Sequence, residues 1–214
     1  GLKAGPLQNK ISVTWSKPGA QVKDLEQLVQ DCVIMHHGED DYGKKLHIYI
    51  SAGICNFTTK LKEHNYQETI YNFDASDLIL DDTIEQFNYI QRYTQAQNAI
   101  PVFCTVYPLS LKVWNSTRLS QNKTTHLRYE IDYDTMQINL EGALWNINNH
   151  IFQLNRNLNV ATPNLANQLK HNRAKGNITY KYNLLVDGCH PDLTLKVRTR
   201  RSIAQAIAKN RGSQ

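Results

Sequence analysis

The chain has 214 residues, a formal charge of +5 at pH 7, 41% hydrophobic residues and 20% charged residues. This length predicts one domain that buries its own core, and the composition excludes an intrinsically disordered chain. No apolar run approaches the roughly 18 residues of a membrane span, and the amino terminus lacks a basic-then-apolar leader. We therefore expect neither a membrane span nor a signal peptide.

The charge is distributed unevenly along the chain. Residues 160–214 hold 10 of the 24 Lys and Arg but only Asp187 and Asp192 of the 19 Asp and Glu, a balance of +8 that leaves residues 1–159 at −3. A basic carboxyl-terminal quarter predicts either a polyanionic partner such as RNA or a solvated helix face without a ligand. Both interpretations stay open. The candidate binding residues are Arg198, Arg200, Arg201 and Lys209.

The cysteine and histidine spacing predicts no metal site. The 4 cysteines include no C-x-x-C pair and no Cys/His grouping with zinc spacing. We expect a reduced, cytoplasmic setting, no disulfide framework, no metal and no cofactor. His36 and His37 stand before the acidic residues at 39–41, but a solvated loop is the preferred interpretation because their spacing matches no standard site.

Apolar periodicity predicts strands and helices in alternation. In chain order the predicted elements are a strand at 11–15, a helix from 22 to 33, a strand at 46–50, a helix at 84–93, a strand at 100–106, a helix of roughly 25 residues from 136 to 158, a possible short strand at 159–162, a short helix around 165–169 and a final helix after Asp192. We expect Asp81 and Asp82 at the positive amino end of the second helix. Pro101 is expected at the start of its strand, since proline cannot donate to a ladder.

This order indicates parallel strands joined by helical crossovers, with helices on both faces of the sheet. The final helix is expected to dock through an apolar stripe and to turn its basic residues outward; the stripe comprises Leu193, Val197, Ile203 and Ile207. Residues 108–127 are interpreted as a long polar loop. Trp15, Trp114 and Trp145 are interpreted as core or loop anchors rather than base-stacking platforms, because no basic-aromatic interleaving surrounds them.

The loop Asp187-Gly188-Cys189-His190-Pro191 carries the candidate chemistry. D-x-x-H places a carboxylate and an imidazole on one tight turn. The carboxylate can orient the ring, and the other ring nitrogen can take a proton from a serine. An Asp-Gly turn that serves only as a turn is the alternative. The position of this loop, just before the last helix of a strand–helix series, favours the chemical interpretation.

The order of these pieces resembles the SGNH (GDSL-type) hydrolases. The matching pieces are Pro18-Gly19-Ala20 before a helix with Asp24-Leu25, Gly53-Ile54-Cys55-Asn56 after the strand at 46–50, and the D-x-x-H loop. The resemblance covers about residues 11–209 and implies a flavodoxin-like three-layer α/β/α sandwich with a short parallel sheet. It also implies that His190 is the general base, Asp187 its orienting partner, and Gly19 and Asn56 the oxyanion donors.

The chain departs from the family in its nucleophile. No Gly-Asp-Ser or G-x-S-x-G occurs, and by the family's order the serine and its strand would precede Ile11. We expect residues 1–10 to be an amino-terminal segment that lacks the first strand, 11–209 the SGNH-like domain, and 210–214 a tail. Cys55 stands where the family has its oxyanion asparagine; Asn56, one position later and in a different backbone phase, is the candidate to take its place. Cys189 is interpreted as a core residue; the alternative, a substitute nucleophile, would need a lowered thiol pKa.

Three functional hypotheses remain. The first is an esterase-type domain, catalytically impaired as this chain stands, which would act on an ester or an acetylated small molecule or glycan if a serine is supplied upstream of Gly1. The second is a hydrolase fold repurposed to bind RNA or another polyanion. The third is a structural protein released from a viral or mobile-element polyprotein, because the terminal Gly and Gln resemble the ends left by picornavirus-like main proteases. The substrate and oligomeric state are left open.

Overall fold

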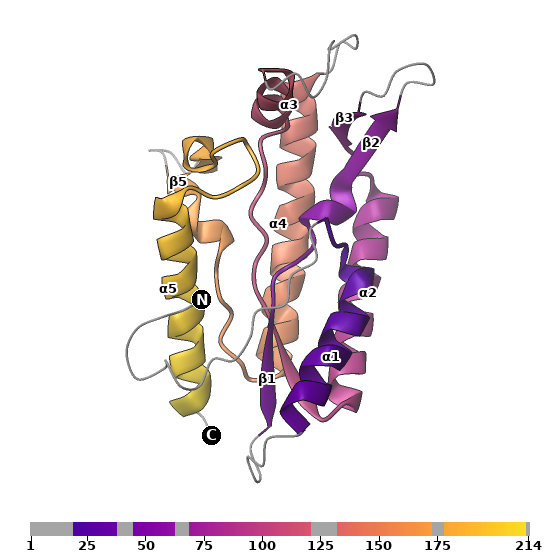
Figure 1. The fold of residues 1–214 in the computed structure, drawn as a ribbon, viewed down its shortest axis with the longest axis vertical. Helices are drawn as coiled ribbons and strands as arrows, with labels where there is room; N and C mark the ends of the chain where they lie inside the picture. Colours follow the sequence, from indigo (N-terminus) through magenta and orange to yellow (C-terminus); the bar gives the residue numbers. More distant parts are fainter. Residues whose placement is uncertain (1–18, 38–44, 63–68, 121–131, 173–177, 213–214) are drawn as a thin grey trace.

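A computed structural model describes residues 19–37, 45–62, 69–120, 132–172 and 178–212. Within these residues, two parallel strands lie between helices (Figure 1). The elements of this central part are α1 (Leu25–His37), β1 (Leu46–Ile50), α2 (Asp77–Ala96), β4 (Ala99–Phe103), α4 (Tyr133–Asn157) and α5 (Leu193–Gly212). The predicted strand at 11–15 lies outside the described residues.

Alternation along β1 explains why helices cover both faces of the strands. Ile48 and Ile50 are buried in the main core, to which Val29 and Val33 of α1 also belong. Tyr49 lies between them in the sequence, and its hydroxyl accepts a hydrogen bond from Asn210 of α5 at 3.0 Å. Successive strand residues face opposite sides of a sheet. Helices α1 and α2 therefore lie on one side and α5 on the other (Figure 1), which confirms the predicted three-layer arrangement.

The long predicted helix is confirmed as α4, which has 25 residues. Asp132 caps its amino end, since its side chain accepts a hydrogen bond from the backbone N–H of Thr135 at 3.0 Å. The apolar repeat is its buried face, with five members in the core: Leu140, Leu144, Ile147, Ile151 and Leu154. Burying one such side chain contributes about 1.5–3 kcal/mol, so this stripe is a major source of stability.

Two asparagines of α4 hydrogen-bond the outer edge of β4 and the chain that follows it. The Phe103 N–H donates to Asn155 Oδ1 at 3.0 Å, and Asn155 Nδ2 donates to the Phe103 carbonyl at 2.7 Å. Asn148 bonds the N–H and carbonyl of Val106 in the same way, at 2.7 and 2.8 Å. These amides satisfy buried backbone groups as a neighbouring strand would.

This edge also explains how β4 accommodates Pro101. The sequence predicted Pro101 as the first residue of its strand, but it is the third residue of β4. Pro101 precedes Phe103 by two residues, so its nitrogen faces the same side as the Phe103 N–H, away from β1. No β1–β4 ladder bond is lost there.

Three other local predictions are wrong. Residues 108–127 are not all loop, because α3 (Leu111–Ser120) forms around the fully buried Leu111. Residues 159–162 are not a strand: Asn159 has a φ of 54°, and the Val160 N–H donates to the Asn155 carbonyl as the chain turns off α4. Helix α2 begins earlier than predicted, so Asp77 rather than Asp81 or Asp82 occupies its first turn.

Two antiparallel hairpins were not predicted. They consist of β2 (Thr58–Lys62) with β3 (Thr69–Phe73), and of β5 (Lys170–Asn172) with β6 (Ile178–Tyr180). Short 3-10 turns complete the described chain: η1 (Val22–Asp24), η2 (Ile54–Phe57), η3 (Ala166–Gln168) and η4 (Tyr182–Leu184). The turn η3 falls where the sequence predicts a short helix.

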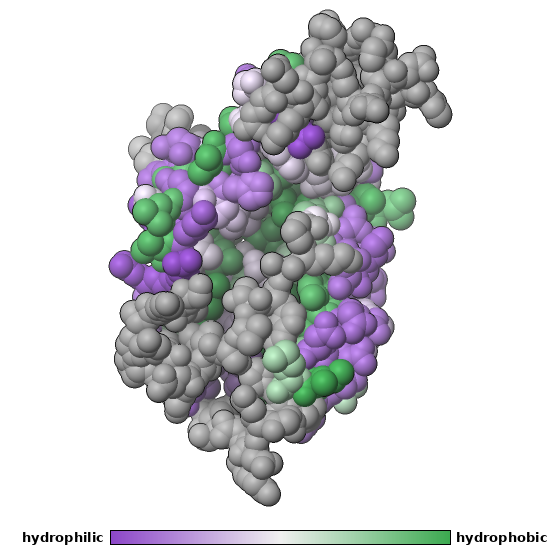
Figure 2. All heavy atoms as spheres, in the orientation of Figure 1, coloured by the Kyte–Doolittle hydropathy of each residue, from purple (hydrophilic) through white to green (hydrophobic). Residues whose placement is uncertain are grey.

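Helix α5 begins after Asp192 as predicted, and the Asp192 carboxylate accepts from the Leu195 N–H at 2.7 Å. Its predicted docking stripe is only partly correct. Leu193 and Val197 are 76% and 47% exposed, whereas Leu195, Ala206, Ile207 and Asn210 are buried. Figure 2 shows hydrophobic residues beside hydrophilic ones on the side where α5 lies. None of the described helices is long and apolar enough to cross a membrane.

Candidate active site

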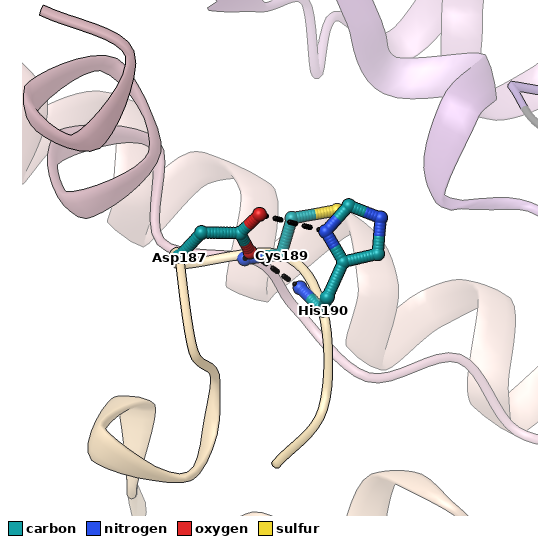
Figure 3. A network of polar contacts seen from close by, with 3 residues as sticks. All are labelled: Asp187, Cys189 and His190. Carbon is teal, nitrogen blue, oxygen red and sulfur yellow. Dashed lines mark hydrogen bonds and ion pairs between the residues drawn. The ribbon is translucent and has the colours of Figure 1, made fainter. Parts of the chain in front are cut away.

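The D-x-x-H loop holds an imidazole against a carboxylate in a fixed geometry. His190 Nδ1 lies 2.7 Å from Asp187 Oδ2, and Asp187 Oδ1 accepts from the backbone N–H groups of Cys189 and His190 at 3.0 and 2.7 Å. An ionised carboxylate only accepts hydrogen bonds, so Nδ1 carries the proton and Nε2 of the neutral ring is an acceptor. Figure 3 shows the second ring nitrogen turned away from Asp187. The His190 side chain is 70% exposed, so this nitrogen is accessible.

The loop is attached to the fold on both sides. Leu185 bridges Pro191, and the Val186 N–H donates to the His190 carbonyl at 2.8 Å, which closes the turn. Gly188 packs onto the start of α3, where its carbonyl accepts from the Ser110 N–H at 2.8 Å. Gly188 has a φ of +82°, and a Cβ there would lie 2.6 Å from the Ser110 carbonyl oxygen. The loop therefore requires glycine at this position.

The electrostatics of Asp187 suit an orienting carboxylate. Partial burial raises its pKa, but hydrogen bonds from the His190 backbone, the His190 ring and the Cys189 backbone outweigh that effect and hold the pKa below its ordinary value. Asp187 thus remains ionised beside the imidazole at neutral pH. An ionised partner stabilises the imidazolium that forms when a ring nitrogen takes a proton.

Cys189 has the opposite character to an activated thiol. Burial, the charge of Asp187 and the neighbouring Cys55 together raise the pKa of Cys189 to about 12. Its side chain packs against the main core, as the sequence interpretation preferred. A nucleophilic cysteine needs a depressed pKa, so these surroundings argue against the substitute-nucleophile alternative.

The two predicted oxyanion residues belong to neighbouring turns. Asn56 is 8% exposed; its Oδ1 accepts from the Val22 N–H at 3.0 Å, and its Nδ2 donates to Gln86 Oε1 at 2.8 Å. Gly19, three residues before Val22, is exposed and has a φ of +73°. Through these two hydrogen bonds, the Asn56 side chain connects the segment after β1 to the turn that follows Gly19 and to α2.

The sequence did not indicate Gln86, which accepts from both Asn56 and the Lys23 N–H. Its place on α2 gives no local signal of this role. The D-x-x-H loop lies near the same region, since Cys55 is close enough to Cys189 to raise its pKa. The structure therefore brings the Asp187–His190 pair and the Gly19–Asn56 turns to one end of the molecule, beyond the carboxyl ends of β1 and β4.

The candidate binding residues on α5 do not all line one cleft. Arg198 and Arg201 line a polar cleft with Lys170, and Arg200 and Lys209 do not. Within the described residues, no group of three His, Cys, Asp or Glu side chains is arranged to hold a metal ion. The acidic residues at 39–41 lie outside the described residues.

Comparison with known proteins supports the fold. The chain is similar to the crystal structure of a GDSL-like lipase from Bacteroides thetaiotaomicron, with a TM-score of 0.54 and 14% sequence identity over 89% of this chain and 72% of that one. No protein-family model matches the chain. No curated protein sequence matches it either. The chain therefore shares the α/β fold of that structure.

Proposed function

We propose that this chain is the general-base part of an SGNH-type ester hydrolase, with His190 as the base and Asp187 as its orienting partner. The observation that carries the proposal is the pair itself. The carboxylate is fixed by two backbone N–H groups, holds Nδ1 at 2.7 Å, and leaves the second nitrogen of an exposed ring available. A serine, supplied from upstream of Gly1, would be the nucleophile.

The proposed reaction follows from the roles of these groups. The imidazole takes the proton of the serine hydroxyl as the serine oxygen bonds to the ester carbonyl carbon. The resulting imidazolium then gives that proton to the departing alcohol as the ester C–O bond breaks, which leaves an acyl-serine. Water repeats the sequence and releases the acid. Asp187 stays ionised throughout and stabilises each imidazolium.

Gly19 and Asn56 are proposed to support the oxyanion. The backbone N–H of Gly19 can donate to a carbonyl oxygen that becomes negative, and such donors contribute about 3–4 kcal/mol each. Asn56 already uses its amide on Val22 and Gln86, so its support consists of fixing the turn that follows Gly19. The substrates proposed are esters and acetylated small molecules or glycans.

The absence of a recognisable nucleophile from this sequence makes the chain impaired on its own. Loss of the serine from such a triad lowers the rate by several orders of magnitude. The test compares the present chain with a longer product of the same reading frame that includes the residues before Gly1. Both are assayed with p-nitrophenyl acetate and an acetylated sugar.

The longer protein is expected to hydrolyse the esters at least about a thousandfold faster than the present chain. His190→Ala in the longer protein should abolish the gain, and Asp187→Asn should lose most of it. His150→Ala is the matched control, because that histidine lies on α4 and bonds Asn88. A longer protein without His190-dependent turnover would overturn the esterase proposal. Turnover by the present chain that vanishes on His190→Ala would overturn the impairment.

A further inference from the structure

A basic cleft lies between η3, β5 and α5. It has a volume of about 300 Å³ and is lined entirely by polar and basic side chains, among them Lys170, Arg198 and Arg201. No acidic residue lines it, and within the described residues none of these three cations has an acidic partner. Its volume is at the lower end of small-molecule sites. The lining fits a small polar anion rather than an apolar ligand.

The remaining lining residues strengthen this conclusion. Asn167, Gln168 and Gln205 also line the cleft, and each carries a side-chain amide. The Gln168 amide donates to the Asn164 carbonyl at 3.4 Å. Arginine matches the oxygens of a phosphate bidentately, and lysine and amides add single donors. The cleft thus offers several donors to a phosphate group.

A second, smaller hollow of about 50 Å³ adjoins this cleft and has a different lining. It contains Trp145 and Phe152 of α4, together with Tyr180 of β6. Trp145 is 57% and Phe152 37% exposed, so both present aromatic surface to solvent. The sequence interpretation of Trp145 as a core or loop anchor is therefore wrong. An exposed aromatic side chain with open surface is suited to stacking with a planar group.

The two hollows have one lining residue in common, and η3 contributes to both. Lys170 lines both, and η3 contributes Ala166 to the second hollow and Asn167 to the basic cleft. A ligand that fills both would place an anionic group beside the two arginines and a planar group against the tryptophan, with Lys170 between them. A nucleotide has this combination of parts.

We propose that the basic cleft and the adjoining aromatic hollow form one site for single-stranded nucleic acid. A backbone phosphate binds Lys170, Arg198 and Arg201, and the neighbouring base stacks on Trp145. This differs from a diffuse basic helix face, because it assigns Arg198 and Arg201 to the site and excludes Arg200. The proposal is independent of the ester-hydrolase proposal, since it shares no residue with the Asp187–His190 pair.

The test is fluorescence anisotropy with labelled oligouridylate and oligothymidylate of about ten nucleotides, within the range that single-strand sites occupy. Arg198→Gln with Arg201→Gln should weaken binding at least about tenfold and reduce the slope of log K against log salt by about 0.7, which corresponds to the one phosphate that both arginines contact. Arg200→Gln is the matched control on the same helix and should change the affinity less than about twofold.

Trp145→Ala should weaken binding at least about fivefold, whereas Trp145→Phe keeps a stacking surface and should retain most of the affinity. Double-stranded RNA should bind more weakly, because its paired bases cannot reach Trp145. The proposal is overturned if Arg200→Gln weakens binding as much as the double replacement of Arg198 and Arg201, if Trp145→Ala leaves the affinity unchanged, or if inorganic phosphate binds and neither oligonucleotide does. His190→Ala should leave nucleic-acid binding intact and separates this test from that of the hydrolase.

Discussion

Replacement of Gly188 by alanine tests whether the D-x-x-H loop is held against α3 as the structure describes. A Cβ at this position would lie 2.6 Å from the Ser110 carbonyl oxygen, 2.7 Å from the Trp114 nitrogen and 3.0 Å from the Val113 Cβ. The first two are backbone atoms at the start of α3. They cannot rotate away as a flexible side chain can, so the loop or the helix must shift.

The expected cost has three parts. Alanine at a φ of +82° costs about 1 kcal/mol more than glycine. Separation of the loop from α3 breaks the Ser110 N–H bond to the Gly188 carbonyl, worth about 1 kcal/mol. Relief of the two close contacts adds a similar amount. The free energy of unfolding should therefore fall by about 3 kcal/mol.

Two glycines of the same chain provide matched controls in urea denaturation followed by circular dichroism. Gly19 also has a positive φ, +73°, but a Cβ there meets nothing within 4 Å, so Gly19→Ala should cost only the backbone strain, about 1 kcal/mol. Gly142 lies on the exposed side of α4 with open space, and Gly142→Ala should stabilise by up to about 1 kcal/mol. If Gly188→Ala costs no more than Gly19→Ala, the described packing of the loop on α3 is wrong.

Three further predictions concern buried and titrating groups. Asn155→Ala should lower the free energy of unfolding by about 3 kcal/mol in urea, because it leaves the buried N–H and carbonyl of Phe103 without partners; a loss below about 1 kcal/mol would contradict the edge pairing. The folded-state pKa of Asp187 lies below its unfolded value of about 3.9. The loss of unfolding free energy caused by Asp187→Asn should therefore have its full size above about pH 3.9 and should vanish as the pH falls through the folded-state pKa. A loss that does not change with pH would contradict the bonds to His190. The pKa of Cys189 is raised to about 12, mainly by burial. This thiol should therefore react with iodoacetamide at pH 8 far more slowly than a small-molecule thiol. Rapid alkylation would contradict this prediction and make Cys189 a candidate nucleophile again.

Features fixed by local sequence were predictable. The α4 repeat is long enough to identify a buried helix face without knowledge of its partners, and the Asp192 cap marks the start of α5. The D-x-x-H turn was predictable for the same reason. All its hydrogen bonds to Asp187 come from residues within three positions of that carboxylate.

Features that depend on distant segments were not predictable. The side of α5 that is buried is decided by packing: Leu193, a member of the predicted docking stripe, is exposed, whereas Leu195, which is not in that stripe, is buried. Asn56 gives no local sign that its amide joins η1 to α2. Trp145 and Lys170 lie 25 positions apart, and the hollow that they share exists only after α4 and β5 have packed.

The two asparagines on α4 also fix the position of this helix along β4 and the chain that follows it. Asn148 and Asn155 are seven residues apart, which is about 10.5 Å along a helix. Phe103 and Val106 are three residues apart, which is about 10 Å along an extended chain. The two spacings coincide, so both amides reach their backbone partners in one alignment, and a slide of α4 by a single turn would break all four hydrogen bonds together. Helix position and strand position are thereby locked to each other, and the chain that leaves β4 toward α3 and the D-x-x-H loop starts from a defined point.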